Sequence, residues 1–229
     1  MDFNAKKSAV LFLDRNRFDF YIDGAKNVLS LPFSETIINA MDVINPQELE
    51  NQIRAFVQQS GINPANIIII LSPNVVFEKD IQAADIQSVE HEIEKFKDSI
   101  PFENIYTQSF PLQQNVRIVA VSRDLCDAIK NSFEKLGFSI DTIVSYFALG
   151  PQINNIQALD PGTAAQIVKN LDTLRHYSFS IEKSITNDQS PAVSKKSPQT
   201  SNKTPMRLYL MIGVFILLLV ILAVLFLTR

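Results

Sequence analysis

Few residues of this chain are of the types that carry out catalysis or hold metal ions, and those few lie far apart. The sequence has two histidines, His91 and His176, and one cysteine, Cys126. Zinc sites and nucleophilic triads need several such side chains converging on one point, which this spacing does not offer. The six glycines form no cluster of the kind that cradles a phosphate. We therefore expect no catalytic residue, no metal site and no cofactor.

The balance of charge favours a protein partner over a nucleic acid. Residues 1–185 carry 23 Asp and Glu against 16 Lys and Arg, a net charge of −7. Such a domain has no excess of cations with which to neutralise phosphates. We expect no nucleic acid as a partner, and a basic protein surface fits the charge better.

A long uncharged segment near the C-terminal end determines where the domain works. Residues Leu208–Thr228 have no charged side chain, and a helix of roughly 20 apolar residues spans a bilayer. Four basic residues precede this segment and one follows it: Lys195, Lys196, Lys203, Arg207 and Arg229. This excess predicts that the N-terminal side is cytoplasmic, and the N-terminus lacks the apolar core of a secretory signal. We expect a single-pass protein with its transmembrane helix at residues 207–229 and membrane lipid among its partners.

Residues 184–206, which precede that helix, differ in composition from the rest. Ser, Thr, Asn, Gln, Lys and Pro dominate, and Ile185 and Val193 are the only large aliphatic residues. Such a segment cannot bury enough apolar surface to offset its ordering entropy. We expect a flexible linker with a typical span of about 25 Å, which tethers a domain of residues 1–183 to the membrane.

The first part of that domain has the pattern of an α/β layer. Four strand-like runs are expected, at Ser8–Leu13, Phe18–Ile22, Asn27–Leu31 and Asn66–Leu71. A helix begins at Pro46 after the capping residue Asn45 and ends at Gly61. The last run is apolar throughout, as expected for a strand covered on both faces. These elements predict a sheet with that helix on one face.

The middle of the chain predicts a second unit with the element order β-α-β-β-α-β. Its elements are expected at Val75–Ile81, 86–96, Asn104–Gln108, Val116–Val121, Arg123–Leu136 and Phe138–Val144. We expect them to form a compact four-stranded sheet with two helices. A last helix, starting at Asp160-Pro161, should pack on the first part.

Five short motifs stand in a fixed order within this region. They are Ser72-Pro73-Asn74-Val75-Val76, Ile100-Pro101-Phe102, Ala120-Val121-Ser122-Arg123, Leu136-Gly137-Phe138 and Tyr146-Phe147-Ala148-Leu149. Their order and spacing resemble the PilM and GspL actin-like proteins of type IV pilus and type II secretion machines, over about residues 8–150. The resemblance implies an α/β fold, a single actin-like (ribonuclease H-like) lobe with an inserted βαββαβ module at about residues 74–146. We expect the second lobe of an actin-like fold to be missing, because residues 151–183 are too few to supply it.

The first turn of the chain departs from that family. Actin-like nucleotide binders carry a hairpin resembling Asp-x-Gly-Ser, in which glycine lets backbone amides approach a phosphate. Here the turn reads Asp14-Arg15-Asn16-Arg17, so the aspartate is kept while glycine and serine are absent. Asp14 is a turn residue under the main hypothesis, and it lies near a phosphate only if the lobe still binds nucleotide.

The resemblance implies a non-catalytic, membrane-anchored scaffold at the bacterial inner membrane. Such a protein would join cytoplasmic components of a type IV pilus or related secretion machine to the membrane. The implied partners are a PilN-like inner-membrane protein and the assembly ATPase, and a homo-oligomer stays open.

Two other hypotheses stay open. In one, the lobe is a residual or oligomer-completed nucleotide-binding ATPase with Asp14 near the phosphates, and ATP binding that is lost on Asp14→Ala would support it. In the other, the chain is an unrelated tail-anchored cytoplasmic adaptor, which neighbouring genes for pilus proteins would argue against.

Overall fold

A computed structural model describes residues 7–82, 86–113, 115–150 and 156–179. The chain divides into two units, Met1–Glu182 and Lys183–Arg229, and every described residue belongs to the first. The predicted linker at residues 184–206 and the predicted transmembrane helix at residues 207–229 lie outside the described residues. Within the described ranges, no helix has both the length and the apolar character needed to cross a bilayer.

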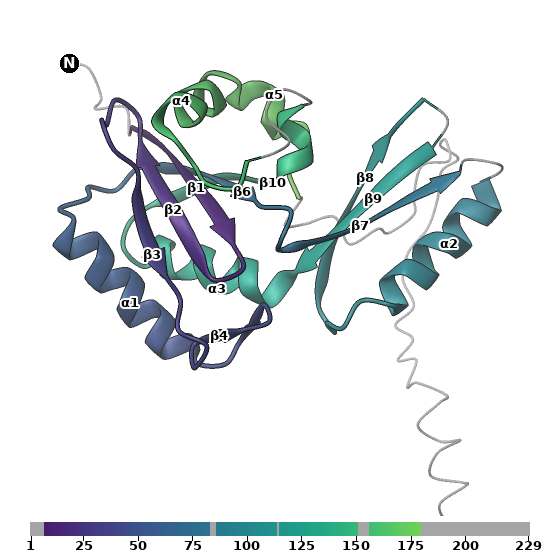
Figure 1. The fold of residues 1–229 in the computed structure, drawn as a ribbon, viewed down its shortest axis with the longest axis horizontal. Coiled ribbons are helices and arrows are strands. Elements are labelled where there is room, and N and C mark those ends of the chain that lie inside the picture. Colours follow the sequence, from purple (N-terminus) through teal and green to yellow (C-terminus); the bar gives the residue numbers. More distant parts are fainter. Residues whose placement is uncertain (1–6, 83–85, 114, 151–155, 180–229) are drawn as a thin grey trace, which may run out of the picture. The chain divides into compact units, whose positions relative to one another are not determined.

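A five-stranded sheet forms the centre of the main lobe (Figure 1). Its strands are β1 (Ser8–Asp14), β2 (Arg17–Ile22), β3 (Leu29–Pro32), β6 (Asn66–Leu71) and β10 (Ser139–Ser145). They lie in the order β10-β6-β1-β2-β3. The first three form an antiparallel meander, whereas β6 runs parallel to β1 and β10 runs parallel to β6. The predicted meander and the interior position of the Asn66–Leu71 strand are confirmed.

Helices cover both faces of this sheet. The helices α1 (Pro46–Gln59) and α3 (Arg123–Glu134) pack against each other on one face, over a core rich in phenylalanine. The helices α4 (Pro161–Lys169) and α5 (Leu171–Arg175) lie on the opposite face, where their apolar side chains meet Val10 and Phe12. Because successive side chains of a strand point to opposite faces, β1 and β6 contribute to both cores. The mixed α/β class predicted from the sequence is confirmed.

The helix ends carry the capping residues that the sequence predicts. The Asn45 side chain accepts a hydrogen bond from the Glu48 N–H at 3.1 Å, with Pro46 as the first residue of α1. Ser122 caps α3 through the Leu125 N–H, and Asp160 caps α4 through the N–H groups of residues 162 and 163. Each cap satisfies donors that the first turn of a helix leaves unpaired. The last helix is therefore confirmed as starting at Pro161, although it is interrupted at Asn170, where α4 ends.

A smaller sheet of three strands follows β6. Its strands are β7 (Val76–Gln82), β8 (Ile105–Pro111) and β9 (Asn115–Ser122), in the order β7-β9-β8 and all antiparallel. The helix α2 (Ile86–Asp98) covers one face through Phe96 and neighbouring apolar residues. The remaining elements are two short strands, β4 (Ile38–Asn39) and β5 (Asp42–Val43), and the 3-10 helix η1 (Tyr146–Leu149).

The four-stranded sheet predicted for the second unit is wrong. The six elements occur in the predicted order, but β10 pairs with β6 in the large sheet and α3 packs against α1. The helix belongs there because its apolar face fits the larger core, where Phe133 stacks on Phe20 with ring centroids 5.6 Å apart. The inserted unit is therefore β7-α2-β8-β9, and α3 with β10 returns the chain to the main lobe.

The stacked ring of Phe133 gives a test of this assignment. Phe133 is fully buried, so Phe133→Ala should lower the free energy of unfolding by about 3–5 kcal/mol, because it removes apolar contacts and leaves a cavity. Urea denaturation followed by circular dichroism measures this change. Ile44→Ala is the control, since Ile44 is 59% exposed, and it should change stability by less than about 0.5 kcal/mol. Equal effects of the two substitutions would contradict the assignment of α3 to the main core.

Candidate functional site

Asp14, the residue named under the nucleotide hypothesis, is the last residue of β1 and is only 6% exposed. Its Oδ1 atom accepts hydrogen bonds from Ser72 Oγ at 2.6 Å and from Asn74 Nδ2 at 2.9 Å. Its Oδ2 atom lies 3.3 Å from Nη1 of Arg17. Both donors to Oδ1 follow the end of β6, so the carboxylate joins the ends of two neighbouring parallel strands.

Arg17, across the turn from Asp14, extends this polar cluster to the segment that leads into α4. Its Nε atom lies 3.3 Å from Oδ1 of the buried Asp19, and its Nη2 atom donates to the Gln157 carbonyl at 2.8 Å. Asp19 Oδ2 in turn accepts from the Leu159 N–H at 3.2 Å. The first hairpin thereby holds the chain segment that precedes α4.

These contacts determine the charge state of Asp14. Burial acts to raise the pKa of its carboxyl, but hydrogen bonds from Ser72, Asn74 and the Arg15 backbone, together with the charge of Arg17, lower that pKa below its ordinary value. Asp14 is thus an ionised carboxylate whose two oxygens are both engaged by side chains of this chain. In the structure Asp14 thus ties the first turn to the chain segment that follows β6.

The cysteine and the two histidines do not lie together in one site. Cys126 is buried, and that burial raises the pKa of its thiol, which makes it a poor nucleophile. His91 is exposed on α2, and His176 is exposed at the end of α5. In the part of the chain that the structure describes, no group of His, Cys, Asp and Glu side chains could hold a metal ion.

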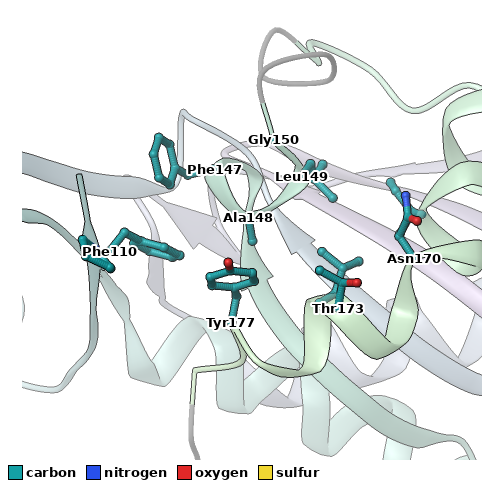
Figure 2. A pocket seen from close by; sticks show the side chains of 11 residues that line it. Phe110, Phe147, Ala148, Leu149, Gly150, Asn170, Thr173 and Tyr177 are labelled. Atoms are coloured by element: carbon teal, nitrogen blue, oxygen red, sulfur yellow. The ribbon is translucent and has the colours of Figure 1, made fainter. Parts of the chain in front are cut away.

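The described residues enclose a cavity of about 660 Å³ that is large enough to bind a side chain or a short peptide segment (Figure 2). It lies between the end of β8, the η1 turn and the α4–α5 segment. Its lining residues are Phe110, Pro111, Phe147, Ala148, Leu149, Gly150, Ile167, Asn170, Thr173, Leu174 and Tyr177. Three distant parts of the sequence therefore supply its walls.

Three aromatic rings form one end of this cavity. Phe110 meets Phe147 edge-on with centroids 5.1 Å apart, and it stacks on Tyr177 at 5.8 Å. The Tyr177 side of the stack is open, because this residue is 39% exposed. The amide of Asn170 and the hydroxyl of Thr173 lie toward the other end (Figure 2). The cavity thus offers an apolar surface for a side chain and two polar groups that can bond a peptide backbone.

The aromatic residues of the cavity were not identified as a site from the sequence. Phe147 lies in one of the motifs that carry the family resemblance, but Phe110 and Tyr177 precede and follow it by 37 and 30 residues. Spacing alone gives no sign that such residues meet. The one signal available was Tyr177 itself, an aromatic residue just beyond the apolar stripe of the last predicted helix.

Comparisons with known proteins were made for the sequence and for the fold. No family model matches the chain, and no curated protein matches it. Among solved structures, a PilM–PilN type IV pilus biogenesis complex is similar at 13% identity and a TM-score of 0.44, covering 62% of this chain and 48% of that one. These are proteins of the kind that the sequence resembles.

Two further structures are similar. One is the cytoplasmic domain of EpsL, an inner membrane component of the type II secretion system of Vibrio cholerae, with 11% identity, a TM-score of 0.40, and 63% of this chain and 59% of that chain covered. The other is a protein with an actin-like ATPase fold from Bacteroides thetaiotaomicron, with 14% identity, a TM-score of 0.36, and 65% and 59% covered. This chain spans about half to three-fifths of the length of the solved chains it matches.

The lowered pKa of Asp14 predicts how stability should depend on pH. A carboxyl group whose pKa is lower in the folded than in the unfolded state stabilises the fold at pH values above its unfolded-state pKa of about 3.9. This stabilisation is lost as the pH falls through the pKa of the folded state. Asp14→Asn should therefore lower the free energy of unfolding by about 1–3 kcal/mol at pH 7. The difference from the unsubstituted protein should shrink below about pH 4.

Urea unfolding at pH 7, 5, 4 and 3 measures this difference. Asp98→Asn is the matched control, because Asp98 is exposed on α2, and it should have little effect at any of these pH values. A deficit for Asp14→Asn that stays constant down to pH 3 would show that the carboxylate charge does not hold the strand ends together.

Proposed function

We propose that this chain is a non-catalytic, membrane-anchored scaffold of a type IV pilus or related secretion machine, whose cytoplasmic lobe holds a segment of a partner protein in the aromatic cavity. The observation that carries the proposal is the lining of that cavity. Its described lining residues combine three aromatic rings and several aliphatic side chains, and none of them carries a carboxylate, imidazole or ammonium group. Such a site suits the capture of an apolar side chain, and among its described lining residues only Tyr177 has a side chain of a type used in acid–base catalysis.

The fold proposed here is a single actin-like lobe. The five-stranded sheet with its opening meander is the lobe, and β7-α2-β8-β9 is inserted between β6 and α3, a smaller unit than the βαββαβ module that the PilM and GspL resemblance implies. In the nucleotide-binding members of that fold, the first hairpin approaches a phosphate. Here the same hairpin is occupied by Asp14 and Arg17, which bond to neighbouring parts of the chain itself.

The proposed partner is a PilN-like inner-membrane protein that offers a short cytoplasmic segment, and the assembly ATPase is a further partner. The PilM–PilN complex is named for that pairing in its own system. Asn170 and Thr173 have no side-chain hydrogen bonds among the described residues, so they are free to bond the backbone of an extended segment. A partner anchored in the same bilayer would gain effective concentration from the predicted linker and helix of this chain.

Site-specific photocross-linking tests the proposal on the whole chain in membranes of its source organism. A photoreactive residue at Leu149, which lines the cavity, should give cross-links to a pilus or secretion protein that mass spectrometry identifies. Phe147→Asp should reduce those cross-links by about ten-fold or more, because a carboxylate would replace part of the apolar wall.

Leu112→Asp is the control for that substitution. Leu112 is an apolar residue that is 36% exposed, whereas Phe147 is half-buried, and Leu112 does not line the cavity, so its change should leave the cross-links in place. Cross-links that contain no pilus or secretion component, or that survive Phe147→Asp, would contradict the proposed site.

A further inference from the structure

Arg117 on β9 joins the inserted sheet to the wall of the cavity. Its Nε and Nη2 atoms bond the two carboxylate oxygens of Asp80 on β7, at 2.6 and 2.7 Å. Its Nη1 atom lies 3.6 Å from Oε2 of Glu78, on the same strand. The guanidinium group is therefore held by two carboxylates of β7.

The same guanidinium group covers one ring of the cavity. Its central carbon lies 4.8 Å from the ring centroid of Phe147, which places the cation over the face of the ring. Glu78 makes a second link to this turn, because its Oε2 atom accepts a hydrogen bond from the Tyr146 hydroxyl at 2.9 Å. Two neighbouring residues of η1 are thus attached to one charged network on the inserted sheet.

The protonation states suit this network. Hydrogen bonding to Asp80 raises the pKa of Arg117, so the guanidinium stays charged. Burial and the bond to Glu78 raise the pKa of Tyr146 to about 12, so its hydroxyl keeps the proton that it donates. Arg117 and Tyr146 therefore both keep their protons throughout the neutral pH range.

We propose that Arg117 is a positioning residue for the aromatic cavity, which fixes Phe147 against Phe110 and thereby sets the affinity of the cavity for an aromatic group. This inference rests on the proposed function, since it assumes that the cavity binds apolar groups. Pairing Asp80 with Arg117 across the strands would stabilise the small sheet by itself. Ion pairing with Asp80 does not require the guanidinium to lie over Phe147. This contact links Arg117 to η1, an element outside the small sheet.

A cysteine placed in the cavity wall reports on aromatic binding. Ala148 lines the cavity and is partly exposed, whereas Ser60, at the end of α1, is exposed far from it in sequence. Ala148→Cys and Ser60→Cys, each in the whole chain in nanodiscs, are treated with N-phenylmaleimide and with N-methylmaleimide. The native Cys126 is buried, so its modification reports unfolding.

The ratio of the phenyl to the methyl reaction rate is the quantity compared. Binding of the phenyl group next to the thiol should make this ratio at residue 148 at least about five times that at residue 60. Equal ratios at the two positions would show that the cavity does not bind aromatic groups, which would overturn the proposed site and the inference together.

Arg117→Gln then tests the positioning role separately. The substitution should lower the ratio at residue 148 by about three-fold, because it removes both the cation–π contact with Phe147 and the paired hydrogen bonds to the Asp80 carboxylate. Arg54→Gln is the matched control, since Arg54 is paired with Glu50 on the distant α1, and it should leave the ratio unchanged. A high ratio that Arg117→Gln does not alter would overturn the inference and leave the proposed function standing.

Exchange of the charged pair separates positioning from simple pairing. Asp80 and Arg117 lie directly opposite each other in the register of β7 and β9, so Asp80→Arg combined with Arg117→Asp restores opposite charges across the strands. The ratio at residue 148 should stay low in this double variant while Cys126 stays unmodified. If the ratio recovered in the double variant, Arg117 would be acting only through its ion pair across the strands, and the inference would be overturned.

Discussion

The pairing of β1 with β6 imposes the layout of the lobe, because both strands are apolar on both faces. Residues 9–13 and 67–71 are at most 1% exposed. A sheet covered on one face only would leave Val10, Phe12 and their neighbours on β6 in water, at roughly 1.5–3 kcal/mol for each side chain. The α1–α3 layer covers one face, and so α4 must cover the other. The segment that contains α4 and α5 is therefore part of the core, and the cavity arises because this required layer meets η1 and the end of β8.

The polar cluster at the first hairpin follows from the same constraint. In open α/β sheets, ligands commonly bind beyond the carboxyl ends of the parallel strands. At those ends of β1 and β6 this chain places Asp14, Ser72 and Asn74, which bond one another, and Arg17 continues the cluster to Gln157. A region that could receive a ligand instead secures the segment leading to α4. The cavity proposed as the binding site lies beside η1, which directly follows β10, and its walls are largely apolar.

The sequence was sufficient for those parts of the fold that depend on local chemistry. The helix starts could be predicted because the caps Asn45, Ser122 and Asp160 bond N–H groups in the first turns of their own helices. The buried strand Asn66–Leu71 could be predicted because it has no polar face. Neither prediction required knowledge of distant contacts. Local chemistry did not predict which strand β10 pairs with. The order β-α-β-β-α-β allows β10 to pair either with β7 or with β6. The decisive contact, Phe133 on Phe20, joins residues more than 100 positions apart. The cavity escaped prediction for the same reason, because its three rings come from three segments.

The last described residue, Phe179, has a mechanical consequence for a protein that is pulled from its C-terminal side. Its N–H donates to the Ile143 carbonyl of β10 at 2.8 Å, and its ring is 2% exposed. A load arriving there would be resisted first by this bond and this buried ring. Tyr177, two residues earlier, forms part of the aromatic end of the cavity. Tension would therefore load β10 and its sheet first through this bond, and it would pass to Tyr177 and the aromatic end of the cavity only once the bond had broken.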